Sequence, residues 1–122
     1  MSSKSSPLPA EASRNSQFLK GLTELATLSL LLDGPHYGLG ILDQLRDRSG
    51  LSVAEGSIYP MLHRLERHGL IASEWTVDAP PARPRRYYSI TAKGRGDLAE
   101  AMAEWSMVSA SLNTFLNRSP AK

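Results

Sequence analysis

Two stretches of this sequence combine residue types that can contact nucleic acid. The first, residues 56–71, carries an apolar side and a basic side at helical spacing and is bounded by Gly56 and Gly69. The second, Arg83–Tyr88, is rich in arginine and tyrosine. Hydroxyl groups and the free N–H groups of a helix N-terminus suit phosphate oxygens, and an arginine can bind guanine through two hydrogen bonds. Together the two stretches predict contacts with the grooves and phosphates of duplex DNA.

The helix expected at residues 57–68 supplies the first candidates. In a helix-turn-helix, the recognition helix enters the major groove with its N-terminal residues toward the bases. Ser57 is expected as the N-cap, and Pro60 in the first turn, where its missing N–H has no helical partner. The same pattern also fits a merely solvated helix face, and this helix alone does not separate the two interpretations. The candidate DNA-binding residues here are Ser57, Tyr59, Pro60, His63 and Arg64.

Positive charge gathers after residue 83. Arg83, Arg85 and Arg86 crowd one short segment, and Lys93 and Arg95 extend the positive charge to the start of the last helix. Cations at a helix N-terminus oppose the helix dipole, so this arrangement favours an external anion over a solvated turn. The net charge of only +2 hides this local polarisation.

The elements that must position these residues are three helices, two strands and a long final helix. Apolar residues spaced three and four apart predict helices at residues 15–32, 37–48 and 57–68. Strands at 70–77 and 85–90 are expected to form an antiparallel hairpin. The predicted fold is mainly α with a small two-stranded β wing: a winged helix-turn-helix plus a long C-terminal dimerisation helix. The expected division is a disordered tail at residues 1–14, the winged helix-turn-helix at 15–90, the dimerisation helix at 91–117 and a tail at 118–122.

The last helix carries an apolar seam at alternating spacings of three and four, which is a heptad pattern. The seam consists of Leu98, Ala101, Trp105, Val108, Leu112 and Phe115. We expect it to pack against the same helix of a second chain and against Phe18 and Leu22 of the first helix. The alternative is a seam buried within its own monomer. A two-fold dimer would match palindromic DNA.

Several other classes of protein find no support in the sequence. The composition, 41% hydrophobic and 21% charged, is that of an ordinary folded domain, and no cysteine is present. The lack of cysteine fits a reducing cytoplasm, and no apolar run approaches the ~20 residues of a membrane span. His63 and His68 are five residues apart and do not share a helix face, so no metal site is expected. No catalytic constellation or phosphate-binding glycine loop is visible, so neither an enzyme nor a cofactor is predicted.

The chain resembles the PadR family of bacterial transcriptional regulators. The resemblance rests on four blocks in order, which together cover roughly residues 22–105. The blocks are Leu30–Gly38, Gly56–Glu66, Gly69–Ile71 and Arg85–Gly94. The short C-terminal part resembles the subgroup that ends after a single dimerisation helix. The proline-rich segment at residues 79–84 differs from many relatives.

The resemblance implies a winged helix-turn-helix homodimer that binds operator DNA, usually as a repressor. It matches Arg85, Arg86 and Tyr87 to the basic strand motif, and we add Tyr37 to the candidate DNA-binding residues. Some short members are similar in having a hydrophobic space at the dimer centre. There Trp105 would stack on a small planar hydrophobic or aromatic effector, although a core role in the seam explains this tryptophan equally well. The alternative function is a winged-helix protein-interaction adaptor without specific DNA binding, because a fold does not fix a function.

Overall fold

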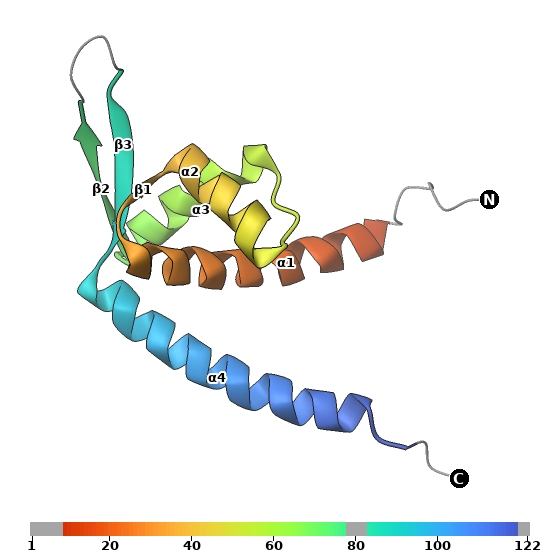
Figure 1. The fold of residues 1–122 in the computed structure, drawn as a ribbon. Coiled ribbons are helices and arrows are strands. Elements are labelled where there is room, and N and C mark those ends of the chain that lie inside the picture. The colour runs from red at the N-terminus through yellow and green to blue at the C-terminus, as the bar shows by residue number, and fades with distance from the viewer. Residues whose placement is uncertain (1–8, 78–82, 120–122) are drawn as a thin grey trace.

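The computed structural model describes the backbone of residues 9–77 and 83–119, with side chains from residue 20 onward (Figure 1). Outside the described part lie residues 1–8 of the tail expected at residues 1–14, residues 78–82, residues 120–122 and the side chain of Phe18. In chain order the elements are α1 (Pro9–Leu30), η1 (Leu31–Asp33), β1 (His36–Tyr37), α2 (Gly38–Gln44), η2 (Leu45–Ser49), α3 (Glu55–Arg67), β2 (Ile71–Thr76), β3 (Arg85–Ile90) and α4 (Ala92–Leu116). The predicted fold class is confirmed: helices dominate, and the antiparallel sheet forms the wing.

The sheet has three strands rather than the two that were expected. β3 lies in the middle and pairs antiparallel with β2 on one side and with the two-residue β1 on the other. In this register Ile71 faces Ile90 and Trp75 faces Arg86, while Tyr37 faces Tyr87. Side chains alternate between the two faces of a strand, so Arg85 and Arg86 point to opposite sides of the sheet.

The core lies where α1, α2, α3 and the sheet meet. Its members come from every helix and include Leu98, near the start of α4. Spacings of three and four on α3 place its inner side chains against the sheet and α2, as the sequence predicts. The largest side chains that are almost fully buried are Leu31, Ile41, Ile58, Leu62, Leu65 and Ile71.

The local details of α3 differ from the sequence expectation. The helix begins at Glu55, with Ala54 as its N-cap, and the Ser57 hydroxyl donates a hydrogen bond to the Ala54 carbonyl oxygen at 2.8 Å. The prediction that Ser57 caps the helix was therefore wrong. Pro60 lies inside the helix rather than in its first turn. Because proline has no N–H, the Gly56 carbonyl lacks its usual helical partner.

The other helices also start and end at slightly different places. α1 begins at Pro9, so its first turns lie in the stretch expected to be a tail. The second predicted helix is divided into α2 and a π-helical turn, η2, which ends at Gly50 with a left-handed φ of 71°. Each boundary moved by a few residues, whereas the order of the elements did not change.

The start of α4 is attached to the domain by close contacts. Thr91 caps the helix: its hydroxyl oxygen accepts from the Gly94 N–H at 3.0 Å and its O–H donates to the Gly69 carbonyl at 2.6 Å. A Cβ on Gly94 would lie 2.0 Å from the Leu70 carbonyl oxygen, so only glycine fits there. Beyond this attachment α4 runs along α1 and away from the rest of the domain (Figure 1).

Candidate nucleic-acid interface

The outward side of α3 carries most of the predicted recognition residues. Ile58, Met61, Leu62 and Leu65 fill the buried side, which leaves the opposite side to solvent. The exposed side chains of α3 include those of Ser57, Tyr59, Pro60, His63 and Arg67, besides the acidic Glu55 at the start of the helix. Hydroxyl, imidazole and guanidinium groups on one exposed helix face can donate hydrogen bonds to phosphates or base edges. Arg67, which was not among the candidates, extends this face by one turn.

Tyr59 combines exposure with a packing role. Its side chain is 49% exposed, yet its ring lies directly against Gly38 at the start of α2. A Cβ on Gly38 would come within 2.5 Å of the Tyr59 ring. The small residue therefore allows α2 and α3 to approach each other, and Tyr59 lies at their junction with part of its ring available to a partner.

Arg64, in contrast, already has an anionic partner. Its Nε and Nη2 atoms both donate to Oε2 of Glu24 on α1, at 2.8 and 2.5 Å. The two side chains are 25% and 28% exposed. To bind a base through both Nε and Nη2, this arginine would have to release the Glu24 carboxylate. No local sequence pattern indicates this pair, because the partners are 40 residues apart.

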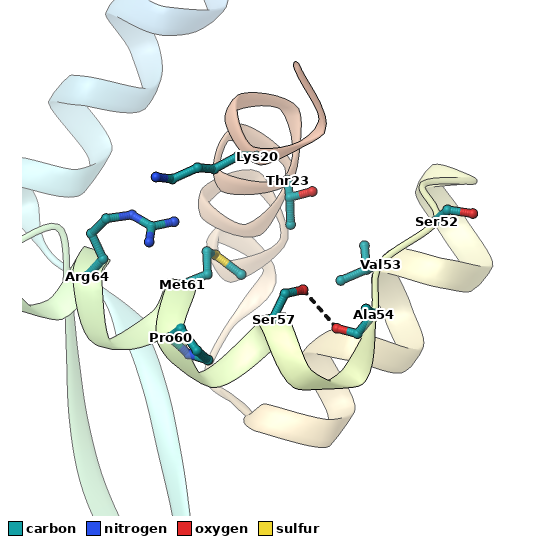
Figure 2. Close-up of a pocket in the computed structure, with 9 residues that line it drawn as sticks. All are labelled: Lys20, Thr23, Ser52, Val53, Ala54, Ser57, Pro60, Met61 and Arg64. Atoms are coloured by element: carbon teal, nitrogen blue, oxygen red, sulfur yellow. Dashed lines mark hydrogen bonds between the residues drawn. The ribbon is translucent and has the colours of Figure 1, made fainter. Parts of the chain in front are cut away.

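A hollow of about 570 Å³ separates α1 from this side of α3 (Figure 2). Lys20 and Thr23 of α1 form one wall, and the connector at residues 52–54 closes one end. Ser57, Pro60, Met61 and Arg64 form the other wall. The exposed Lys20 adds a positive charge beside the recognition helix.

The outer face of the sheet brings three predicted residues together. The Arg85 guanidinium lies 4.6 Å from the centre of the Tyr37 ring, a cation–π contact. Tyr37 and Tyr87 meet edge to face with their ring centres 5.9 Å apart. Arg83 precedes β3 and is exposed. Neither arginine has a carboxylate partner among the described residues, so both can accept an external anion.

Arg86 lies on the opposite face and is engaged with other elements. Its Nη2 donates to Oε1 of Glu66 at 3.0 Å and its Nε donates to Oγ of Ser73 at 2.9 Å. Its guanidinium also lies 5.9 Å from the centre of the Trp75 ring and 5.7 Å from that of Tyr88. Burial raises the pKa of the Tyr88 hydroxyl, and the positive charge of Arg86 partly opposes that rise. Arg86 therefore differs from its neighbour Arg85 in having a carboxylate partner within the described part of the chain.

Lys93 gives a local explanation for one of the cations at the start of α4. Its Nζ donates to the His68 carbonyl oxygen at 2.8 Å, at the C-terminal end of α3. A cation is favourable at that end of a helix dipole. The charge at the N-terminus of α4 is thus partly accounted for within the chain, without an external anion.

The expected dimerisation seam divides into a buried and an exposed part. Leu98 is only 2% exposed because it packs into the core of its own chain, so a role in contacting a second chain was wrongly assigned to it. Ala101 and Leu22 are half-buried. Trp105, Val108, Leu112 and Phe115 are between 49% and 57% exposed. Four large apolar side chains along one helix are an unusual exposure for an isolated chain.

Proteins of a known family share this architecture. It combines a helix-turn-helix, a wing that carries arginines and a long helix, α4, that extends away from the domain. A profile of the Transcriptional regulator PadR-like family matches residues 27–100, more than half of the chain. The chain belongs to the PadR-like family. The expected resemblance is therefore confirmed.

Individual PadR-like relatives agree with this assignment. The chain is 37% identical over 84 residues to the transcriptional regulator Rv3488 of Mycobacterium tuberculosis, which covers 69% of this chain and 76% of that protein. The crystal structure of a PadR-like regulator from Bacillus cereus matches with a TM-score of 0.74 and 34% identity, over 84% of this chain and 99% of that one. A PadR-family regulator from Eggerthella lenta matches with a TM-score of 0.75 and 30% identity, over 90% and 95% of the two chains.

Membership of the PadR-like family makes this chain a DNA-binding transcriptional regulator rather than an enzyme. Two kinds of feature are absent from the described part of the chain. No helix in that part is long and apolar enough to cross a membrane. No group of three or more histidine or acidic side chains there is arranged to hold a metal ion.

Proposed function

We propose that the protein is a homodimeric, sequence-specific repressor of the cytoplasm that binds a palindromic operator. The outward face of α3 enters the major groove, and the wing contacts the flanking phosphates. The observation that carries this proposal is the pairing of an exposed polar face on α3 with Arg83 and Arg85, two wing arginines without a carboxylate partner among residues 9–77 and 83–119. Arg83 and Arg85 serve as phosphate contacts, with Tyr37 and Tyr87 beside them. Ser57, Tyr59, Pro60 and His63 form the face that meets the groove.

The exposed seam of α4 supports the homodimer. A second copy of α4 would cover Trp105, Val108, Leu112 and Phe115, which are exposed in the single chain. We expect it also to contact Leu22 of α1, which is half-buried. Each of these large side chains is about half-exposed, so covering it contributes on the order of 1 kcal/mol. A two-fold axis through this interface would set two α3 helices on one side of the DNA. Half-sites about one helical turn apart, roughly 34 Å, are the geometric consequence.

An effector fits the same interface. Trp105 is 49% exposed and lies in the middle of the seam. Two copies of this indole facing each other would offer flat apolar surfaces to a small planar hydrophobic or aromatic molecule. Such a molecule would change the spacing between the two α3 helices, and the repressor would then leave its operator.

Selection of bound sequences from random duplex DNA tests the central proposal. We expect an inverted repeat with half-sites one helical turn apart, together with a dimer in analytical ultracentrifugation. An enriched site without inverted symmetry would contradict the dimeric arrangement. If no duplex is bound even at low salt, the adaptor alternative gains support, because phosphate contacts are strongest there.

A further inference from the structure

Three side chains from α3, β2 and β3 form a closed ring of hydrogen bonds below the wing. Glu66 Oε1 accepts from Arg86 Nη2 at 3.0 Å, and Glu66 Oε2 accepts from the Ser73 hydroxyl at 2.6 Å. Ser73 Oγ in turn accepts from Arg86 Nε at 2.9 Å. Both carboxylate oxygens and two guanidinium nitrogens are thus engaged. The planar guanidinium gives this ring a defined geometry.

The ring lies at the point where the wing leaves the body of the domain. Glu66 belongs to the last turn of α3, and the hairpin of β2 and β3 extends beyond α3 (Figure 1). Toward the tip of the wing, Trp75 is 67% exposed and Val77 is 63% exposed. Apolar packing therefore contributes little to holding the outer hairpin, whereas directional hydrogen bonds join it to α3.

We propose that Glu66, Ser73 and Arg86 are positioning residues that set the angle between the recognition helix and the wing. This inference rests on the proposed function, in which both elements contact one operator. Arg86 acts through Glu66 instead of contacting a phosphate, and the acidic Glu66 promotes binding to the polyanion. Only a wing held at the correct angle places Arg83 and Arg85 on phosphates while α3 lies in the groove.

Glu66 distinguishes this proposal from a purely electrostatic one. Removing a carboxylate near DNA should strengthen binding if charge alone matters. Positioning predicts the opposite for Glu66→Ala, a roughly tenfold loss of operator affinity. Glu66→Gln carries the same charge change but keeps an acceptor for Arg86 and a polar atom for Ser73. We therefore expect Glu66→Gln to bind the operator at least as tightly as the unmodified protein.

Arg86 supplies the second arm of the test. Arg86→Met keeps the length of the side chain and should weaken operator binding about as much as Glu66→Ala. The double variant Glu66→Ala/Arg86→Met should bind the operator no more weakly than either single variant, because both substitutions break the same ring of hydrogen bonds. The slope of log affinity against log salt should stay unchanged in Arg86→Met. In Arg85→Ala it should become shallower by about 0.9, the value for one lost phosphate contact.

A matched control and a milder variant complete the design. Glu74 lies on the opposite face of β2 and has no hydrogen-bond or ion-pair partner in the described part of the chain. Glu74→Ala removes the same charge without touching the ring, so it should bind slightly tighter. Ser73→Ala changes no charge and should lose about threefold in operator affinity. Circular dichroism gives the thermal midpoint of every variant. If Glu66→Ala proves less stable than the unmodified protein, Ser73→Ala still tests the positioning role, because it changes no charge.

The measurement is fluorescence anisotropy with the selected operator and with an unrelated duplex of equal length. The expected losses concern the operator, while affinity for the unrelated duplex changes little. Tighter operator binding by Glu66→Ala, equal to that of Glu66→Gln, would overturn the positioning role. So would a shallower salt slope in Arg86→Met. If the unmodified protein binds neither duplex, the proposed function itself fails. This outcome differs from the two results that would overturn only the positioning role.

Discussion

α3 and α4 are both amphipathic helices, but only α3 has its apolar side covered within the chain. On α3, Ile58, Leu62 and Leu65 are buried between α1, α2 and the sheet. On α4, Leu112 and Phe115 remain at least half exposed. The same periodicity therefore marks a core in one helix and, in the function proposed above, a dimer interface in the other. What separates the two cases is tertiary position, because α4 leaves the domain after its first turns (Figure 1).

The covered side of α3 should show the larger response to truncation. Leu62 is 0% exposed, and Leu62→Ala should lower the free energy of unfolding by about 3 kcal/mol, within the usual range for buried leucines. Urea denaturation followed by circular dichroism measures this change. Leu39→Ala, at a leucine that is 43% exposed, serves as the matched control and should cost less than about 1 kcal/mol. Equal losses at the two positions would show that the core lies elsewhere.

The uncovered side of α4 should respond in assembly rather than in folding. Leu112→Asp places a charge in the proposed interface, which should leave a folded monomer at micromolar concentration. Operator affinity should fall about a hundredfold, or 2.7 kcal/mol, because one half-site contact is lost. Sedimentation velocity and anisotropy measure the two effects.

Ser111→Asp is the control for Leu112→Asp, since it adds the same charge at the neighbouring exposed position, outside the seam. It should remain a dimer. If Leu112→Asp also remains a dimer, then the α4 seam is not the interface. If instead it unfolds, the seam belongs to the core of the single chain, and the contrast between α3 and α4 is lost.

The sequence was sufficient for the order of the elements and for the apolar side of α3. Both depend on local spacing, which survives small shifts of helix ends. The N-terminus of α3 was missed because Val53, 6% exposed, draws the connector into the core and lets the helix begin at Glu55. That constraint is tertiary. β1 was missed because two residues are too short to show a period.

The roles of the arginines were the least predictable part of the interface. Arg85 and Arg86 are neighbours of one type, but strand alternation turns them to opposite faces. The acidic partners of Arg64 and Arg86 lie 40 and 20 residues away in the chain, beyond any local pattern. A count of positive charge therefore shows where arginines gather, but it does not show which of them already have a carboxylate partner within the chain.

The smallest expected effect is a change in stability at alkaline pH, which arises from the buried side chain of Tyr88 on β3. Burial raises the pKa of the Tyr88 phenol above 10.0, an effect that Arg86 opposes and Glu66 adds to. Above pH 10 the unfolded chain releases this proton before the folded chain does, so deprotonation favours unfolding. The stability that Tyr88 contributes is fully present below pH 10 and is lost as pH rises through its folded pKa.

Tyr88→Phe removes this loss. The free energy of unfolding of the variant should fall less steeply between pH 9.5 and 11 than that of the unmodified protein, measured by urea denaturation at each pH. Dimer dissociation should show no such difference between the two proteins, because Tyr88 lies in the core and not on the α4 seam. Parallel alkaline curves for the two proteins would contradict a buried phenol. If the two proteins differ only in dimer dissociation and not in unfolding, Tyr88 would instead belong to the dimer interface.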